Sequence, residues 1–152
     1  MTAGTVPAVA TSLVPATFDL TAWGSWRPVP TERVQATMVA PGLVRLASSP
    51  FLAGGVARGD LVAVSSTGNG WTVDALVEPA AVSVVRLLGG SREELAPAVR
   101  GLADIGLIAR RHASLGVAVV DVPIGRSLTA VSELAVRLSH ALTVVEVSCN
   151  RH

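Results

Sequence analysis

The order of hydrophobic patterns predicts an α+β fold, in which a small β-meander or SH3-like barrel is followed by a ferredoxin-like βαββαβ unit. Two observations lead to this prediction. Residues 31–82 contain four or five short apolar segments separated by turn sequences, which is typical of a small curled sheet or barrel. Residues 83–149 show the order strand, helix, two strands, helix, strand, which is that of the ferredoxin-like motif.

Residues 1–30 are rich in Ala, Thr, Val and Pro. Their spaced prolines prevent a helix, so we expect an extended or disordered arm. Phe18, Trp23 and Trp26 lie inside this arm. Since buried aromatic side chains contribute strongly to stability, we favour their packing onto the body of the protein over packing onto a partner.

The meander has four clear strands: Arg33–Val39, Leu43–Ala47, Leu61–Val64 and Trp71–Val77. Pro41-Gly42 is a turn signal between the first two, and the Ser, Thr and Gly of residues 65–70 indicate a hairpin turn between the last two. The last strand runs into the next region with no linker. We therefore predict that residues 31–82 and 83–152 share one core.

The ferredoxin-like unit has four expected strands: Ser83–Leu88, Leu107–His112, Val117–Val122 and Thr143–Cys149. Ser91 and Glu94 match a capping box for a helix over Ser91–Ile105, and Ser127 or Thr129 can cap a second helix. The helical spacing of six apolar residues predicts that they are buried against the sheet: Leu95, Val99, Leu102, Val131, Leu134 and Leu138.

Composition narrows the class of protein. The net charge of +1 argues against nucleic acid as the main ligand, because that requires a clustered basic face. Half of the 152 residues are hydrophobic and only 15% are charged. Two explanations of this low charge are equally favoured. One is a core rich in Ala and Val, and the other is an apolar face covered by a partner or a second copy. No apolar run approaches the ~20 residues that cross a bilayer, and residues 1–20 do not resemble a secretory signal.

The candidate ligand site is at the end of the first strand of the second unit. Arg86 is the one charged residue in an apolar strand, and it leads into Gly89-Gly90-Ser91, where a helix start could hold an anion. A tight turn is the simpler explanation of the two glycines. Asp60 follows Gly59 at a strand start and is a candidate partner for Arg86, or for loop backbone.

Other reactive residues are few. Cys149 is the single cysteine, which excludes an internal disulfide framework and a Cys-rich zinc site and fits a reduced cytoplasm. A nucleophilic cysteine needs a base, and the imidazoles are those of His112, His140 and His152. No acidic pair is placed by the sequence at general acid/base distance. We expect no metal and no cofactor.

Several short motifs occur in an order that resembles the bacterial domain of unknown function numbered 4265. They span residues 31–150 and are Glu32 to Ala36, Ser49-Pro50-Phe51, Gly59-Asp60, Ser83-Val84-Val85-Arg86, Asp121-Val122-Pro123 and Cys149. The resemblance implies a polar, hydroxyl-rich stretch before Arg86. Here that stretch is Pro79 to Val85 and keeps only Ser83 with Arg86, which weakens an enzymatic interpretation taken from relatives.

These observations predict a cytoplasmic, non-catalytic accessory or binding protein that acts through a protein partner or through self-association. Two alternatives stay open. One is a sensor of a small anion or amino acid at Arg86, Asp60 and residues 89–91. The other is a small bacterial enzyme that uses Cys149 or a histidine.

Overall fold

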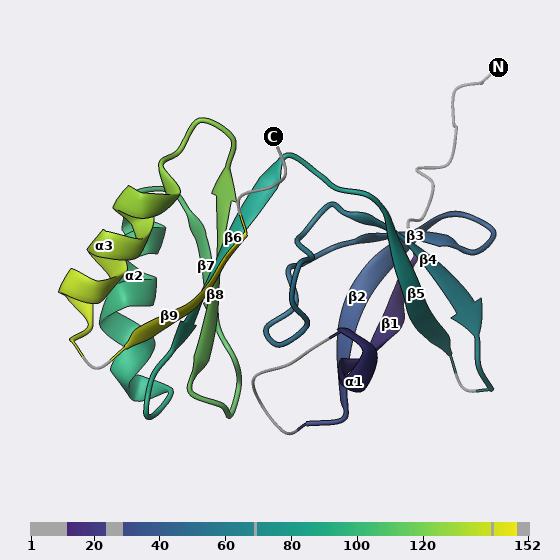
Figure 1. Cartoon of the computed structure of the whole chain (residues 1–152), viewed down its shortest axis with the longest axis horizontal. Coiled ribbons are helices and arrows are strands. Elements are labelled where there is room, and N and C mark those ends of the chain that lie inside the picture. Colours follow the sequence, from purple (N-terminus) through teal and green to yellow (C-terminus); the bar gives the residue numbers. More distant parts are fainter. Residues whose placement is uncertain (1–11, 24–28, 69, 141, 149–152) are drawn as a thin grey trace, which may run out of the picture.

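The computed structural model describes residues 12–23, 29–68, 70–140 and 142–148, which form two units side by side (Figure 1). One is a closed five-stranded β-barrel, and the other is a four-stranded sheet with helices on one face. The predicted α+β class, with a barrel followed by a ferredoxin-like unit, is confirmed. None of the helices in the described part of the chain is long and apolar enough to cross a membrane.

The barrel is a simple meander. Its strands are β1 (Leu13–Asp19), β2 (Thr31–Ala40), β3 (Leu43–Leu46), β4 (Leu61–Ser66) and β5 (Trp71–Glu78). Each strand is antiparallel to the next, so the first and fifth run in the same direction and close the barrel as a parallel pair. Alternate side chains point inward and form the barrel core, among them Ala16, Phe18, Val34, Ala36, Val44, Leu46, Val62, Val64 and Val73.

The arm expected over residues 1–30 is corrected in its second half, because Leu13–Asp19 is a full barrel strand paired along its length with β2. Pro15 is tolerated because β1 pairs with β5 only at Ala16 and Thr17, which leaves the proline on an unpaired stretch of that edge. The aromatic residues pack onto the body as expected: Phe18 is fully buried, and Trp23 contacts it edge-on. Trp26 and residues 1–11 lie outside the described residues.

A short helical turn, α1 (Leu20–Trp23), follows β1. The carboxylate of Asp19 accepts hydrogen bonds from the Thr21 hydroxyl at 2.6 Å and the Thr21 backbone N–H at 3.0 Å. These bonds stabilise the ionised form and lower the pKa of Asp19. The turn places the Trp23 indole N–H 3.3 Å from the backbone oxygen of Val73, so α1 is tied to β5.

The second unit contains strands β6 (Val82–Leu88), β7 (Ile108–Arg111), β8 (Val117–Pro123) and β9 (Thr143–Ser148) in the order β7-β8-β6-β9. A 3₁₀ turn (Glu93–Leu95) and helix α2 (Ala96–Asp104) connect β6 to β7, and helix α3 (Leu128–Leu138) connects β8 to β9. The Ser127 hydroxyl caps α3 by accepting from Ala130 N–H at 3.1 Å. This is the βαββαβ order that the sequence predicts.

The buried hydrophobic residues form two main clusters and a small one between the units, and the barrel cluster includes Val117 of β8. In the second unit, both helices cover one face of the sheet (Figure 1). The buried side chains there include Val85, Leu87, Ala118, Val120 and Val122 from strands, and Leu95, Ala98, Leu102, Val131 and Ala135 from the helical segments. Of the six helix residues expected to be buried, Val99, Leu134 and Leu138 are only partly so. A third cluster of Ala57, Val84 and Val119 lies between the units.

Candidate functional site

Residues 47–60, which connect β3 to β4, fill the space between the barrel and the sheet face that carries no helix (Figure 1). We call this segment the junction loop. Leu52, Ala53 and Val56 point into the barrel core, whereas Ala57 packs against Val84 of the sheet. The junction loop has no regular structure, so its backbone N–H and C=O groups need partners from elsewhere.

Arg86 supplies two of those partners. Its side chain is fully buried and lies on the junction-loop face of β6. The guanidinium donates to the Pro50 carbonyl from Nε at 3.1 Å and from Nη2 at 2.9 Å, and to the Val56 carbonyl at 2.9 Å. One planar guanidinium therefore holds two separate parts of the loop. A lysine ammonium does not have this planar arrangement of donors.

Two carboxylates hold backbone N–H groups of the same loop. Glu32, from β2, accepts from the backbone nitrogens of Phe51, Leu52 and Ala53 at 2.6, 2.8 and 2.9 Å. Asp60 is fully buried and accepts from Ala57 N–H at 2.9 Å and from Ala80 N–H at 2.8 Å. The second of these bonds ties the end of the loop to the segment that enters β6.

Asp121, on β8, extends the network into the sheet. Its carboxylate accepts from the Ser49 hydroxyl and forms an ion pair with Arg58 at 2.9 Å. Ser49 Oγ in turn accepts from the Arg58 backbone N–H at 2.8 Å. Ser49 and Asp121 are nearly inaccessible, with 1% and 3% exposure, so this cluster acts as an internal clamp.

The edge strand β7 adds a further contact. Arg110 donates to the Ser49 carbonyl at 2.6 Å and stacks over the Phe51 ring, 4.7 Å from its centroid. The His112 ring contacts the Phe51 ring edge-on, and the two ring centroids are 5.1 Å apart. Its Nδ1 accepts from the backbone N–H groups of Ser114 and Leu115, which places the neutral ring's proton on Nε2.

The five candidate ligand residues fall into two separate places. Arg86 and Asp60 both hold the junction loop, whereas Gly89, Gly90 and Ser91 form the turn after β6. A Cβ on Gly90 would lie 2.9 Å from a Glu94 carboxylate oxygen, so a negative charge already covers this turn. A Cβ on the facing Gly116 would lie 2.5 Å from the Gly89 carbonyl oxygen. Ser91 Oγ accepts from Glu94 N–H at 3.3 Å, so the turn serves to start the helical segment.

The structure also contains a cavity of about 500 Å³ where the barrel meets the β7–β8 turn. Its lining combines polar and apolar side chains, listed here: Val29, Thr31, Glu32, Arg33, Phe51, Leu52, His112, Ala113, Ser114 and Leu115. This volume is in the range of small-ligand pockets. No local sequence pattern indicates this cavity, because its walls come from three distant segments.

The residues considered for an enzymatic alternative are Cys149 and the three histidines. Cys149 and His152 lie outside the described residues, and His140 is exposed at the end of α3. Within the described ranges, no group of three or more His, Cys, Asp or Glu side chains is arranged to hold a metal ion.

Sequence reasoning missed Arg58 and Arg110, whose partners are a carboxylate and a carbonyl far away in the chain. The motifs that suggested a family resemblance nevertheless contain most residues of the network. Glu32, Ser49, Asp60, Arg86 and Asp121 all belong to the short motifs that suggested a family resemblance, and the structure brings all five to the junction loop. The motifs therefore mark residues that act together to hold the junction loop.

The comparisons agree with the fold. No curated protein matches this sequence. A solved structure described as a "Novel crystal structure of a hypothetical protein from Neisseria gonorrhoeae" is similar, with a TM-score of 0.65 and 15% identity. The match covers 93% of this chain and 97% of that one, and at this identity it shows the fold alone. The family model for a domain of unknown function, DUF4265, matches residues 32–145, and the chain belongs to this family.

Proposed function

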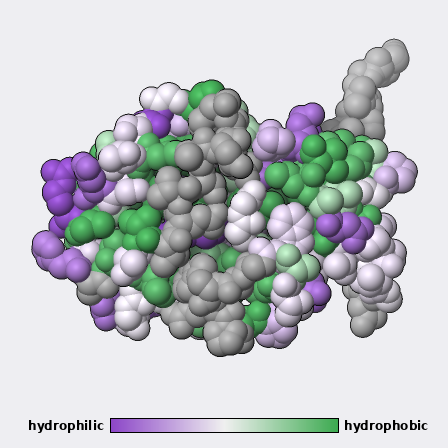
Figure 2. Space-filling model, viewed as in Figure 1, coloured by the Kyte–Doolittle hydropathy of each residue, from purple (hydrophilic) through white to green (hydrophobic). Residues whose placement is uncertain are grey.

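We propose that this protein is a non-catalytic accessory module that binds a protein partner through one end of its barrel. The observation that carries the proposal is an apolar band on the outside of that end, which we call the barrel band. It consists of Leu13, Val39, Leu43, Ala63, Ala75 and Val77. Figure 2 shows hydrophobic residues gathered over the end of the barrel near β3 and β4.

The register explains why these side chains form one surface. Leu43 on β3 is directly opposite Ala63 on β4, which is directly opposite Ala75 on β5. Val39, next to the residue that pairs with Leu43, and Val77, two residues after Ala75, are 51% and 52% exposed. Large exposed apolar side chains that gather in this way are typical of protein interaction sites.

The chemistry of the partner follows from the barrel. Each barrel strand in the described part of the chain has a neighbour on both sides, although β1 and β5 pair at two positions only, so strand addition is not the favoured mode of binding. Arg45, Asp74 and Glu78 are exposed near the band and carry mixed charges. We therefore expect a partner segment that presents apolar side chains, held by burial of apolar area and not by a charged patch.

Site-specific photo-crosslinking in the native host tests this proposal. A crosslinking residue at position 77 should yield one discrete adduct, and the same residue at Gln35, exposed elsewhere on β2, should not. The captured protein is then purified and its affinity measured. Val77→Glu should weaken binding at least tenfold, about 1.4 kcal/mol. Equal adducts from both positions, or unchanged affinity of the variant, would overturn the proposal.

A small-ligand sensor is the second candidate, and the cavity between the barrel and the β7–β8 turn favours it. The Glu32 carboxylate, the Arg33 side chain and the His112 imidazole line it beside Phe51. Such a mixture suits a zwitterion such as an amino acid. A ligand bound only by the native state raises the melting temperature. An amino-acid panel that shifts the melting temperature of the wild type but not of Arg33→Ala would support this candidate.

A further inference from the structure

We infer that a hollow between the end of α2 and one face of α3 binds an acidic peptide segment of a partner protein, through one apolar side chain and the carboxylates beside it. The hollow has a volume of about 220 Å³. Helix α3 lines it with Ala130, Val131, Leu134 and Arg137, and Ile105, Arg126 and Ser127 complete it. We call it the α2–α3 hollow. It belongs to the second unit, whereas the barrel band belongs to the first, so the inference does not depend on the proposed function.

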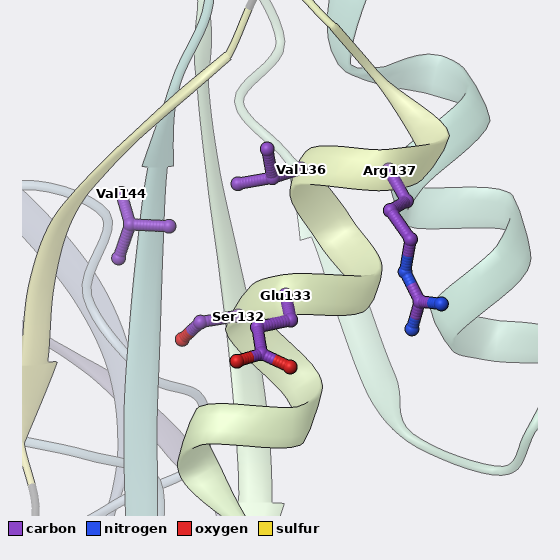
Figure 3. Close-up of a pocket in the computed structure, with 5 residues that line it drawn as sticks. All are labelled: Ser132, Glu133, Val136, Arg137 and Val144. Carbon is purple, nitrogen blue, oxygen red and sulfur yellow. The ribbon is translucent and has the colours of Figure 1, made fainter.

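One face of α3 forms the apolar part of the α2–α3 hollow. Ala130, Leu134 and Arg137 recur at helical spacing, so they lie along the same side of the helix. Val131, which is only 4% exposed, lies at the base of this face. Figure 3 shows the Arg137 side chain extending from α3 toward α2, on the opposite side of the helix from Val144. A positive charge therefore lies beside an apolar surface.

A second positive charge comes from the turn between β8 and α3. Arg126 Nη2 donates to the Ile105 carbonyl oxygen at 2.8 Å, which holds this guanidinium against the end of α2. Ile105 is 42% exposed, and Ile124, in the same turn as Arg126, is 60% exposed. The Ser127 hydroxyl already caps α3. The polar side chains of the described lining that can bind a ligand are therefore the two arginines.

The protein does not neutralise these two charges. Arg126 and Arg137 are exposed, and neither forms an ion pair within the described ranges of the chain. Asp104 at the end of α2 and Glu133 on α3 are the acids closest to them along these two helices, and neither lines the hollow. Guanidinium groups bind carboxylates through two parallel hydrogen bonds. The two unpaired cations therefore select a ligand that carries negative charge.

The size of the α2–α3 hollow favours a peptide over a free small molecule. Pockets for small molecules usually have volumes of about 300–1,000 Å³ and enclose most of the ligand. This hollow is smaller, and its apolar walls are Ile105, Val131 and Leu134. It suits one aliphatic side chain, and a free phosphate ion would leave those walls in water. A segment in which a leucine is flanked by Asp or Glu residues satisfies both the apolar walls and the two arginines.

A titration of the full chain, followed by NMR, tests the inference with the peptide acetyl-Gly-Glu-Leu-Glu-Gly-amide. The amide signals of residue 105 and residues 126–137 should shift as the peptide binds. Replacing both glutamates of the peptide by glutamine, or its leucine by alanine, should weaken binding about tenfold. The absence of shifts up to millimolar peptide would overturn the inference. Equal binding of the alanine peptide, or equal shifts with inorganic phosphate, would also overturn it, because the hollow would then bind an anion only.

Variants of the protein separate the two parts of the α2–α3 hollow. Arg126→Gln combined with Arg137→Gln should weaken peptide binding about tenfold. Arg100→Gln is the matched control, since Arg100 is exposed on α2 and does not line the hollow. Ala130→Leu keeps both charges but fills the apolar part, so it should also weaken binding. Melting temperatures of the variants confirm that each is folded. An equal loss of affinity in Arg100→Gln, or unchanged affinity in Ala130→Leu, would overturn the inference.

Discussion

The two faces of the four-stranded sheet are covered by different kinds of structure, and their side chains differ accordingly. On one face, the helices α2 and α3 meet Val85, Leu87 and Val120 in a dry apolar core. On the other face, the junction loop meets Arg86 and Asp121. The same two strands, β6 and β8, supply both sets by simple alternation.

The difference follows from backbone hydrogen bonding. A helix satisfies nearly all of its own N–H and C=O groups, so only apolar side chains are needed beneath it. An irregular loop leaves those groups unpaired, and an unpaired buried group costs about 1–3 kcal/mol. The charged residues on the second face are therefore the price of covering a sheet with a loop. We expect them to determine how the two units are joined.

The largest effect should come from Arg86→Met, which keeps the length of the side chain and removes the fork. The Pro50 and Val56 carbonyls would lose their donors in a buried environment. We expect a loss of about 3–5 kcal/mol in the free energy of unfolding. Urea denaturation measures it.

Arg86→Lys serves as the control for geometry. Lysine keeps the charge but cannot donate to both carbonyls as a planar fork, so an intermediate loss is expected. If the lysine variant were as stable as the wild type, charge alone would matter, and the fork would have no special role in holding the loop.

Leu102→Ala probes the opposite face. Leu102 is fully buried between α2 and the sheet. Truncation should cost about 2–5 kcal/mol through lost burial and a residual cavity. The informative measurement is hydrogen exchange. Leu102→Ala should speed amide exchange in the second unit. The amides of Phe51–Ala53 should still exchange only through global unfolding, as in the wild type. Equal loss of local protection in the junction loop would show that the two faces are not separable.

The sequence predicted the helix-covered face well because the signals there are local. Helical spacing and the Ser127 cap act within a few residues. The first helix starts later than the expected Ser91, because a 3₁₀ turn (Glu93–Leu95) comes before α2, which begins at Ala96. The barrel was harder. Strand β1 was assigned to a loose arm on account of its proline, since nothing in the local pattern shows that Pro15 lies where β5 is not paired.

The junction-loop face was recognised only as a set of scattered polar residues. The partners of Arg86 at this face include backbone carbonyls, which every residue has and which leave no mark in a sequence. The sequence suggests Asp60 as the partner of Arg86, with a bound anion at Gly89 to Ser91 as the alternative. Burial of Arg86 was correctly anticipated as something that requires compensation. Which groups compensate for the burial of Arg86 depends on the path of residues 47–60, because that path brings the Pro50 and Val56 carbonyls to the guanidinium.

Glu32→Gln should have a medium effect. The amide retains one oxygen acceptor, but it lacks the negative charge and the second oxygen that receive three N–H groups. Charge-assisted hydrogen bonds are roughly twice as strong as neutral ones, so we expect a loss of about 1–3 kcal/mol. The exposed Glu78 provides a matched control, and Glu78→Gln should change stability by less than about 0.5 kcal/mol. Similar losses in both variants would remove Glu32 from the network.

The smallest effect gives the sharpest comparison, because one chemical change is made on each face. Ser49→Ala removes a hydroxyl that donates to Asp121 and accepts from Arg58 N–H, and it should cost about 1–2 kcal/mol. Ser132→Ala, on the helical side, removes a buried hydroxyl that has no hydrogen-bond partner in the described structure. Alanine also favours a helix more than serine does. This variant should therefore be unchanged or more stable by up to about 1 kcal/mol. Both are compared with wild type by thermal and urea unfolding at one low protein concentration. Opposite signs would show that the loop face needs its polar groups and that the helix face does not, whereas a destabilised Ser132→Ala would reveal a hydrogen bond on the face we describe as apolar.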